Sequence, residues 1–162
     1  MKQSVQTVEQ AASPEADLDL AQFFPYRLAR LAEDVSQALA AIYRERFDLT
    51  RQEWRVLATL ARENALTAME VGSRTALDKM QVSRAVGAMQ ARGLLRRRAD
   101  RADRRNKPLS LTSSGRRLYA RIVPLALERE RALLTELTAA ERVMLTKVLD
   151  QVSATAQQLT RS

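Results

Sequence analysis

The chain has 162 residues but no cysteine, no histidine and only four glycines. Without cysteine it can form neither a disulfide nor a thiol redox sensor. Without histidine it lacks the commonest acid–base catalyst and, with cysteine also missing, the usual zinc ligands. Four glycines are too few to suggest a glycine-rich phosphate loop, and no pattern pairs a nucleophile with a base. The sequence therefore favours a protein that is not an enzyme and that carries no metal and no cofactor.

The chain also lacks a long apolar run of about 18 residues and a basic amphipathic segment with an unbroken positive face. We therefore expect no membrane partner. Residues 1–17 are polar, rich in glutamine, serine, glutamate and alanine, and contain no apolar core of a secretory signal. We interpret them as a mobile tail of a cytoplasmic protein.

Positive charge is present in excess, with 27 lysines and arginines against 19 acidic residues. Residues 96–107 hold seven basic and two acidic residues, a local excess of +5 within a formal net charge of +8. Basic charge gathered on one short segment is typical of a nucleic-acid contact. The plainer alternative for the same residues is a charged hairpin that is merely solvated.

Apolar periodicity and capping patterns predict a mainly helical chain. A heptad-like apolar stripe predicts a long first helix that starts near Leu20 or Pro25. Three threonines, each followed three residues later by glutamate, fit capping boxes at Thr50, Thr67 and Thr138. The further helices are expected at about 50–63, 67–74, 78–91, from 112 or 113 to about 137, and after Thr138.

Residues 94–98 and 109–111 are expected to form two short strands around the basic turn, and Pro108 should keep this hairpin short. The order of elements predicts a winged helix-turn-helix, which we assign to residues 49–112 as the DNA-binding domain. Residues 18–48 and 113–162 are assigned to a helical dimerisation region. Their apolar stripes exceed what the central domain can cover, so a second copy is expected to bury them in a homodimer.

Three segments resemble the MarR family of bacterial transcriptional regulators, and the resemblance extends over about residues 24–160. The most specific is Asp103-Arg104-Arg105 followed by Leu111-Thr112, which is similar to the family's wing pattern. Residues 49–57 and 90–95 look like the family's entry to the second helix and exit from the recognition helix.

The resemblance implies that Arg105 enters the minor groove, that Asp103 holds it in position, and that Arg104 is a further DNA contact. Elementary physics agrees, because a narrow minor groove concentrates negative potential that attracts arginine. A carboxylate two residues away on the same face of a strand can also order the guanidinium group.

The predicted recognition helix has two distinct faces. Val82, Val86 and Met89 are expected to face inward, whereas the outward face carries Lys79, Gln81, Ser83, Arg84 and Ala88. The polar members lie in the first two turns, where a helix-turn-helix reads bases, and glutamine suits adenine as arginine suits guanine. Alternatively, some of them touch only phosphate. Further candidates for phosphate contacts near helix ends are Thr67, Arg74 and Thr75.

The resemblance also implies a small-molecule effector, bound between the first helix, the fifth helix and the DNA-binding core. The candidate lining residues are Phe24, Tyr26, Arg30, Trp54 and Leu57. The rings of Tyr26 and Trp54 could pack against an aromatic acid whose carboxylate is held by Arg30 or Arg27. The alternatives are that Trp54 is simply part of the core and that Tyr26 and Arg30 decorate a helix surface.

Together these features favour a dimeric, sequence-specific transcriptional regulator, expected to be a bacterial repressor that binds palindromic double-stranded DNA. The alternative is an architectural or RNA-associated winged-helix protein without a ligand, since sequence-blind binding needs only an arginine-rich wing. The polar outward face of the recognition helix favours the first hypothesis. The ratio of affinities for a palindrome and for random duplex would separate the two.

Overall fold

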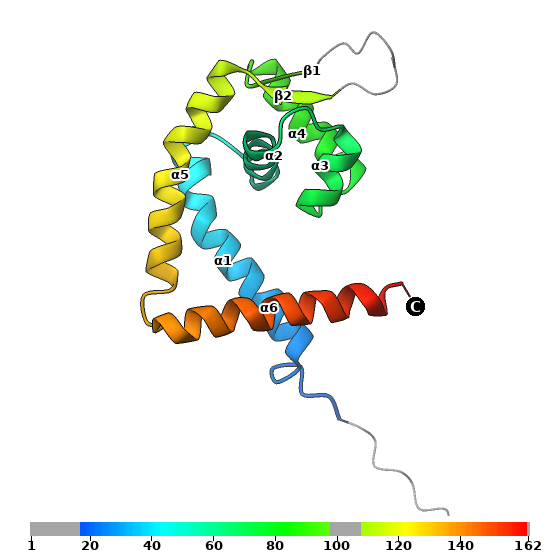
Figure 1. Cartoon of the computed structure of the whole chain (residues 1–162), viewed down its shortest axis with the longest axis vertical. Helices are drawn as coiled ribbons and strands as arrows, with labels where there is room; N and C mark the ends of the chain where they lie inside the picture. Colours follow the sequence, from blue (N-terminus) through cyan, green and yellow to red (C-terminus); the bar gives the residue numbers. More distant parts are fainter. Residues whose placement is uncertain (1–16, 98–107, 162) are drawn as a thin grey trace, which may run out of the picture. The chain divides into compact units, whose positions relative to one another are not determined.

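The computed structural model of the chain describes residues 17–97 and 108–161. Within these ranges it contains six helices and one antiparallel two-stranded hairpin (Figure 1). In chain order the elements are α1 (Phe24–Phe47), α2 (Arg51–Arg62), α3 (Ala68–Thr75), α4 (Lys79–Ala91), β1 (Leu95–Arg97), β2 (Leu109–Leu111), α5 (Ser113–Leu133) and α6 (Ala139–Leu159). The chain divides into two units between residues 34 and 35, within α1. The predicted fold class, mainly helical with a small hairpin, is confirmed.

Four helices begin at a reciprocal capping box. At α2, the Thr50 hydroxyl oxygen accepts from the Glu53 amide at 3.2 Å, and the Glu53 carboxylate accepts from the Thr50 amide at 2.7 Å. The same pattern starts α3, α4 and α6 at Thr67, Asp78 and Thr138. Hydrogen bonds from the backbone and side chain of Thr67 lower the pKa of Glu70. A side-chain N-cap stabilises a helix start by about 1 kcal/mol, so these four boundaries are set locally, as predicted.

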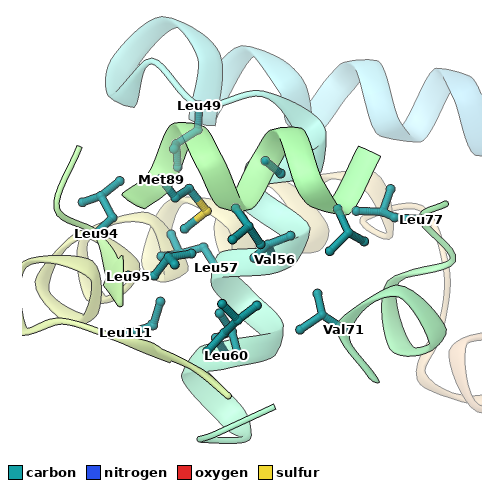
Figure 2. Packing of buried hydrophobic residues seen from close by; sticks show 14 of the residues in the cluster. Leu49, Val56, Leu57, Leu60, Val71, Leu77, Met89, Leu94, Leu95 and Leu111 are labelled. Atoms are coloured by element: carbon teal, nitrogen blue, oxygen red, sulfur yellow. The ribbon is translucent and has the colours of Figure 1, made fainter. Parts of the chain in front are cut away.

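Helix α2 packs against α3, α4, α5 and β2. Its Val56, Leu57 and Leu60 are fully buried, as is Met89 of α4 (Figure 2). Val86 of α4 is fully buried as well. Burying one such side chain stabilises the fold by roughly 1.5–3 kcal/mol. The inward face that the sequence predicted for α4 is thereby confirmed, and the cluster joins α2, α3 and α4 to the hairpin.

The hairpin is short and is anchored at its base. Leu95 pairs with Leu111 and Arg96 with Ser110, and β2 begins directly after Pro108, as expected. The Leu109 amide also donates to the Leu66 carbonyl at 2.7 Å. Successive residues of a strand point to opposite faces. Consequently the leucine pair packs into the core while the Arg96 side chain is exposed.

The start of α5 lies tightly against the chain that leaves α4. The Thr112 hydroxyl donates to the Gly93 carbonyl at 2.7 Å and accepts from the Gly115 amide at 3.1 Å. A Cβ atom at residue 115 would overlap the carbonyl oxygen of Leu94, so only glycine permits this approach. These contacts fix where α5 leaves the hairpin.

Helix α5 ends at Leu133, four residues earlier than the sequence predicted. Thr138 must be extended (φ −65°, ψ 163°) to cap α6, so the chain has to leave the helical conformation before it. Arg142 satisfies the carbonyls left open, since its guanidinium donates to Leu134 at 2.8 Å and to Leu137 at 3.0 Å. No helix among the described residues has both the length and the hydropathy needed to cross a bilayer.

Candidate nucleic-acid interface

The turn between α3 and α4 sets how the recognition helix leaves the core. Helix α3 ends at Ala76 in the left-handed region (φ 53°), and the Leu77 amide donates to the Gly72 carbonyl at 3.3 Å. A Cβ at residue 72 would lie 3.1 Å from the Leu77 carbonyl oxygen, so glycine eases the close packing of this turn. Asp78 then caps α4. Local interactions therefore fix the first turn of α4, the predicted recognition helix.

The outward face of α4 is the one predicted from the sequence. Its exposed residues include Lys79, Ser83, Arg84 and Ala88, whereas Gln81 is half-buried. The Gln81 side-chain oxygen accepts from the Asp78 amide at 3.1 Å as part of the capping box. This bond uses one of the two lone pairs of the Gln81 oxygen, so the side chain keeps both an acceptor site and its NH2 group, and its contact with DNA stays a prediction.

A cavity of about 340 Å³ borders this face and extends to the start of α2. Gln52 of α2 lines it together with Gln81 and Arg84 of α4. The sequence analysis missed Gln52. This residue lies between Thr50 and Glu53 of a capping box, and that pattern predicts the start of a helix but no contact with DNA. Its position beside two predicted base-reading residues makes it a further candidate for contact with DNA.

The end of α4 is held by both local and distant interactions. Gly93 (φ 65°) ends the helix, with its amide donating to Gln90 at 2.9 Å and the Leu94 amide donating to Met89 at 2.9 Å. Arg92 donates to the carbonyls of Phe47 and Asp48 at 3.0 and 2.5 Å. The recognition helix is thus tied to the end of α1, and no local sequence signal indicates this link.

The three residues predicted near helix ends as phosphate contacts are all engaged within the chain. Thr75 is buried, and its hydroxyl donates to the Val71 carbonyl at 2.6 Å. Thr67 serves as the N-cap of α3. Arg74 donates to the Glu63 carboxylate at 2.9 Å. Exposed ion pairs contribute little, so Arg74 can exchange this partner for phosphate more readily than Thr75 can leave its own. All three DNA contacts stay predictions.

The wing residues Asp103, Arg104 and Arg105 lie outside the described residues, and their roles at DNA stay predictions. The structure does describe the base of the wing, which comprises Arg96 and Arg97 of β1. Arg97 of β1 donates from Nε to the Gln90 side-chain oxygen at 3.2 Å, which links the hairpin to the last turn of α4. Arg96 and Arg97 are both exposed, so the base of the wing presents positive charge next to the recognition helix.

Of the predicted effector contacts, Phe24, Tyr26 and Arg30 are exposed residues of the unit that ends at residue 34. Leu57 has no exposed surface and belongs to the core. Trp54 is partly buried. The role of all five in binding an effector stays a prediction.

Trp54 lies between two tyrosine rings that sequence reasoning missed. Its ring stacks on Tyr43 at 6.1 Å and on Tyr119 at 6.0 Å, between centroids. The three rings come from α1, α2 and α5, and a lone tyrosine on a helix gives no sequence signal for such a stack. A cavity of about 290 Å³ lies between the second half of α1 and α5, with Arg46, Arg129, Glu45 and Glu128 among its lining residues.

Known proteins with similar sequences and structures indicate the family to which this chain belongs. A sequence model of the MarR family matches residues 47–106. The HTH-type transcriptional regulator PecS of Dickeya dadantii is 26% identical over 149 residues, which cover 90% of this chain and 89% of PecS.

Two solved structures are similar over most of the chain. A MarR family transcriptional regulator from Silicibacter pomeroyi is 31% identical, with a TM-score of 0.71, and the match covers 84% of this chain and 99% of that one. Bordetella bronchiseptica BpsR, whose DNA binding is regulated by 6-hydroxynicotinic acid, is 27% identical, with a TM-score of 0.76 and coverages of 85% and 98%. The chain therefore belongs to the MarR family of DNA-binding transcriptional regulators.

Proposed function

We propose that the protein is a homodimeric repressor that binds a palindromic operator and is released from it by a small aromatic acid. The observation that carries the proposal is the exposed polar face of α4, where Lys79, Ser83 and Arg84 project from a helix held at both ends. A rigid helix with such a face is suited to reading bases in the major groove.

Support for a dimer comes from α6, which has no buried residue within the described chain. Its exposed apolar residues are Val143, Met144, Leu145, Val148, Leu149 and Leu159. Leu145, Val148, Leu149 and Leu159 recur at helical spacing on one side of α6, and an exposed apolar stripe of this kind is suited to pairing with a second copy of itself. We assign residues 18–48 and 113–162 to the dimerisation region and residues 49–112 to DNA binding.

On the operator, the two copies of α4 would lie in successive major grooves about 34–36 Å apart, with the wings in the flanking minor grooves. Arg84 is suited to guanine, and Gln81 is suited to adenine. Thr67, Arg74 and Thr75 are proposed to contact phosphate. Asp103, Arg104 and Arg105 are proposed to act at the minor groove, where Asp103 would orient Arg105.

For the effector we propose an aromatic acid, which is the chemical class of the regulator of the similar protein BpsR. Phe24, Tyr26, Arg30, Trp54 and Leu57 remain the proposed contacts, with Leu57 shaping the site from within the core. The effector can release DNA only if it binds the DNA-incompatible state more tightly than the operator-bound state.

The test is binding of the purified protein to the intergenic DNA beside its own gene, titrated with salt and with random competitor duplex. A sequence-specific repressor should bind its operator at least about 10³-fold more tightly than random DNA, as one dimer per palindrome. Equal affinity for both would instead support an architectural protein. Adding 6-hydroxynicotinic acid and related aromatic acids to the operator complex then tests release.

A further inference from the structure

An open cavity of about 440 Å³ lies beside the hairpin. The α2–α3 loop, both strands and the first turn of α5 contribute to it. Its lining residues are Asn64, Arg96, Ser110, Leu111, Thr112, Ser113 and Arg116. The predicted base-reading residues of α4 do not line it, so the DNA contacts proposed above leave it without a role.

Two guanidinium groups from different elements line the cavity. Arg96 of β1 is exposed and lies opposite Ser110 across the strand pair. Arg116 of α5 donates to the side-chain oxygen of Asn64. Asn64 is a neutral acceptor, so this hydrogen bond orients the guanidinium without cancelling its charge. Two positive charges from separate parts of the chain thus converge on one hollow.

Among residues 17–97 and 108–161, which the structure describes, no carboxylate lines this cavity. The cavity between α1 and α5 provides the contrast, because there Glu45 and Glu128 accompany Arg46 and Arg129. Charges of both signs can neutralise one another in that second cavity, whereas the charged residues described beside the hairpin, Arg96 and Arg116, are both positive. Its electrostatic potential therefore favours an anion.

Ser113 adds to this preference because it occupies the first position of α5, a 21-residue helix. The first amides of a helix have no partner within the helix and carry partial positive charge. The Thr112 hydroxyl is already used by Gly93 and Gly115. We therefore expect an anion to take its hydrogen bonds from the two arginines, Ser113 and the nearby amides.

We infer that this cavity binds a phosphate-type oxyanion between Arg96 and Arg116. Guanidinium groups match phosphate geometry with paired donors. A volume of about 440 Å³ exceeds what one phosphate fills and falls in the range of small-molecule sites. The phosphate can thus belong to the DNA backbone or to a free phosphorylated molecule. The first source rests on the proposed function, whereas the second does not.

The test is calorimetric titration of the full chain with inorganic phosphate and with glucose 6-phosphate, using glucose as the uncharged control. The variants are Arg96→Gln and Arg116→Gln. Arg117→Gln is the matched control, because Arg117 is adjacent on α5 but hydrogen-bonds to Ser114 and does not line the cavity. Arg116→Gln loses the hydrogen bond to Asn64, so thermal unfolding is used to check that this variant still folds. Arg96 is exposed and takes no part in that bond, so Arg96→Gln tests the cavity independently.

We expect both cavity variants to bind phosphate or glucose 6-phosphate roughly tenfold more weakly, with Arg117→Gln close to wild type. Binding to operator and random DNA identifies the source. If Arg96→Gln weakens both DNAs alike and Arg117→Gln does not, the backbone phosphate is the ligand. If DNA affinity is unchanged while glucose 6-phosphate binding falls, the ligand is a free phosphorylated molecule.

The inference is overturned if Arg96→Gln and Arg117→Gln behave alike toward phosphate, glucose 6-phosphate and DNA. Failure of the proposed function would look different. In that case the wild type would not prefer its operator over random DNA, yet phosphate binding would still depend on Arg96.

Discussion

Helices α2 and α6 begin in the same way but differ in what covers them. Both start at a threonine capping box, and both carry a row of apolar residues. In α2 the row is buried, with Val56, Leu57 and Leu60 fully covered, whereas in α6 Val148 and Leu149 are 42% and 48% exposed. The comparison teaches that local signals form a helix but do not decide its partner. The apolar face of α2 is covered within the chain, whereas that of α6 is exposed, and we propose that a second copy covers it.

The largest effect is expected from a charged residue on the apolar face of α6, because it tests directly whether a second copy covers that face. Val148→Asp should abolish the dimer, with a loss of about 3–5 kcal/mol or more, because an unpaired carboxylate would be buried at the interface in each copy. Sedimentation velocity would show a monomer. Thermal unfolding should still report a folded DNA-binding domain. A variant that remains dimeric would exclude α6 from the interface.

A substitution that leaves an empty space in the buried core around α2 should destabilise the fold rather than the dimer. Leu60→Ala is expected to lower the free energy of unfolding by about 2–5 kcal/mol, because it removes packing from a site with no exposed surface. Urea denaturation measures this loss. The matched control is Leu145→Ala on α6, which is 39% exposed and should affect mainly the concentration dependence of unfolding. Equal losses in the two variants would contradict the contrast between the helices.

Helix α4 is buried on one face and exposed on the other, and the third prediction tests whether its exposed face reads DNA bases. Arg84→Ala should weaken operator binding by about 1–3 kcal/mol and relax the preference at one base pair, since the side chain is exposed and suited to guanine. Fluorescence anisotropy with operator variants measures both effects. Arg121→Ala is a control of equal charge change, because Arg121 stacks on the Phe47 ring at 5.2 Å. If the variant loses affinity equally for all sequences, Arg84 contacts only phosphate.

The smallest expected effect concerns Gly87 in the middle of α4. A Cβ there meets nothing within 4 Å, so Gly87→Ala should stabilise folding by about 1 kcal/mol. Gly115→Ala should destabilise it, because its Cβ would overlap the Leu94 carbonyl. Thermal unfolding should show a higher melting temperature for Gly87→Ala and a lower one for Gly115→Ala. Lower operator affinity in Gly87→Ala would indicate that the α4 backbone approaches DNA closely at this position.

Much of the fold could be predicted because its signals are short-range. The capping boxes at Thr50, Thr67 and Thr138, the terminating Gly93 and the two faces of α4 each depend on residues within a few positions. Contacts between distant residues gave no comparable signal. Arg92 reaches carbonyls 44 and 45 residues earlier, and Arg116 reaches Asn64 across 52 residues.

The sequence by itself determined the helix starts, the two short strands and the face that α4 presents, because hydrogen bonding and hydrophobic periodicity act between close neighbours. Only the tertiary structure decided that Trp54 is stacked between Tyr43 and Tyr119, and that Arg96 and Arg116 converge on one cavity. Such arrangements depend on how separate elements pack, and packing is decided by the shape and volume of the whole core rather than by the spacing of residues along the chain.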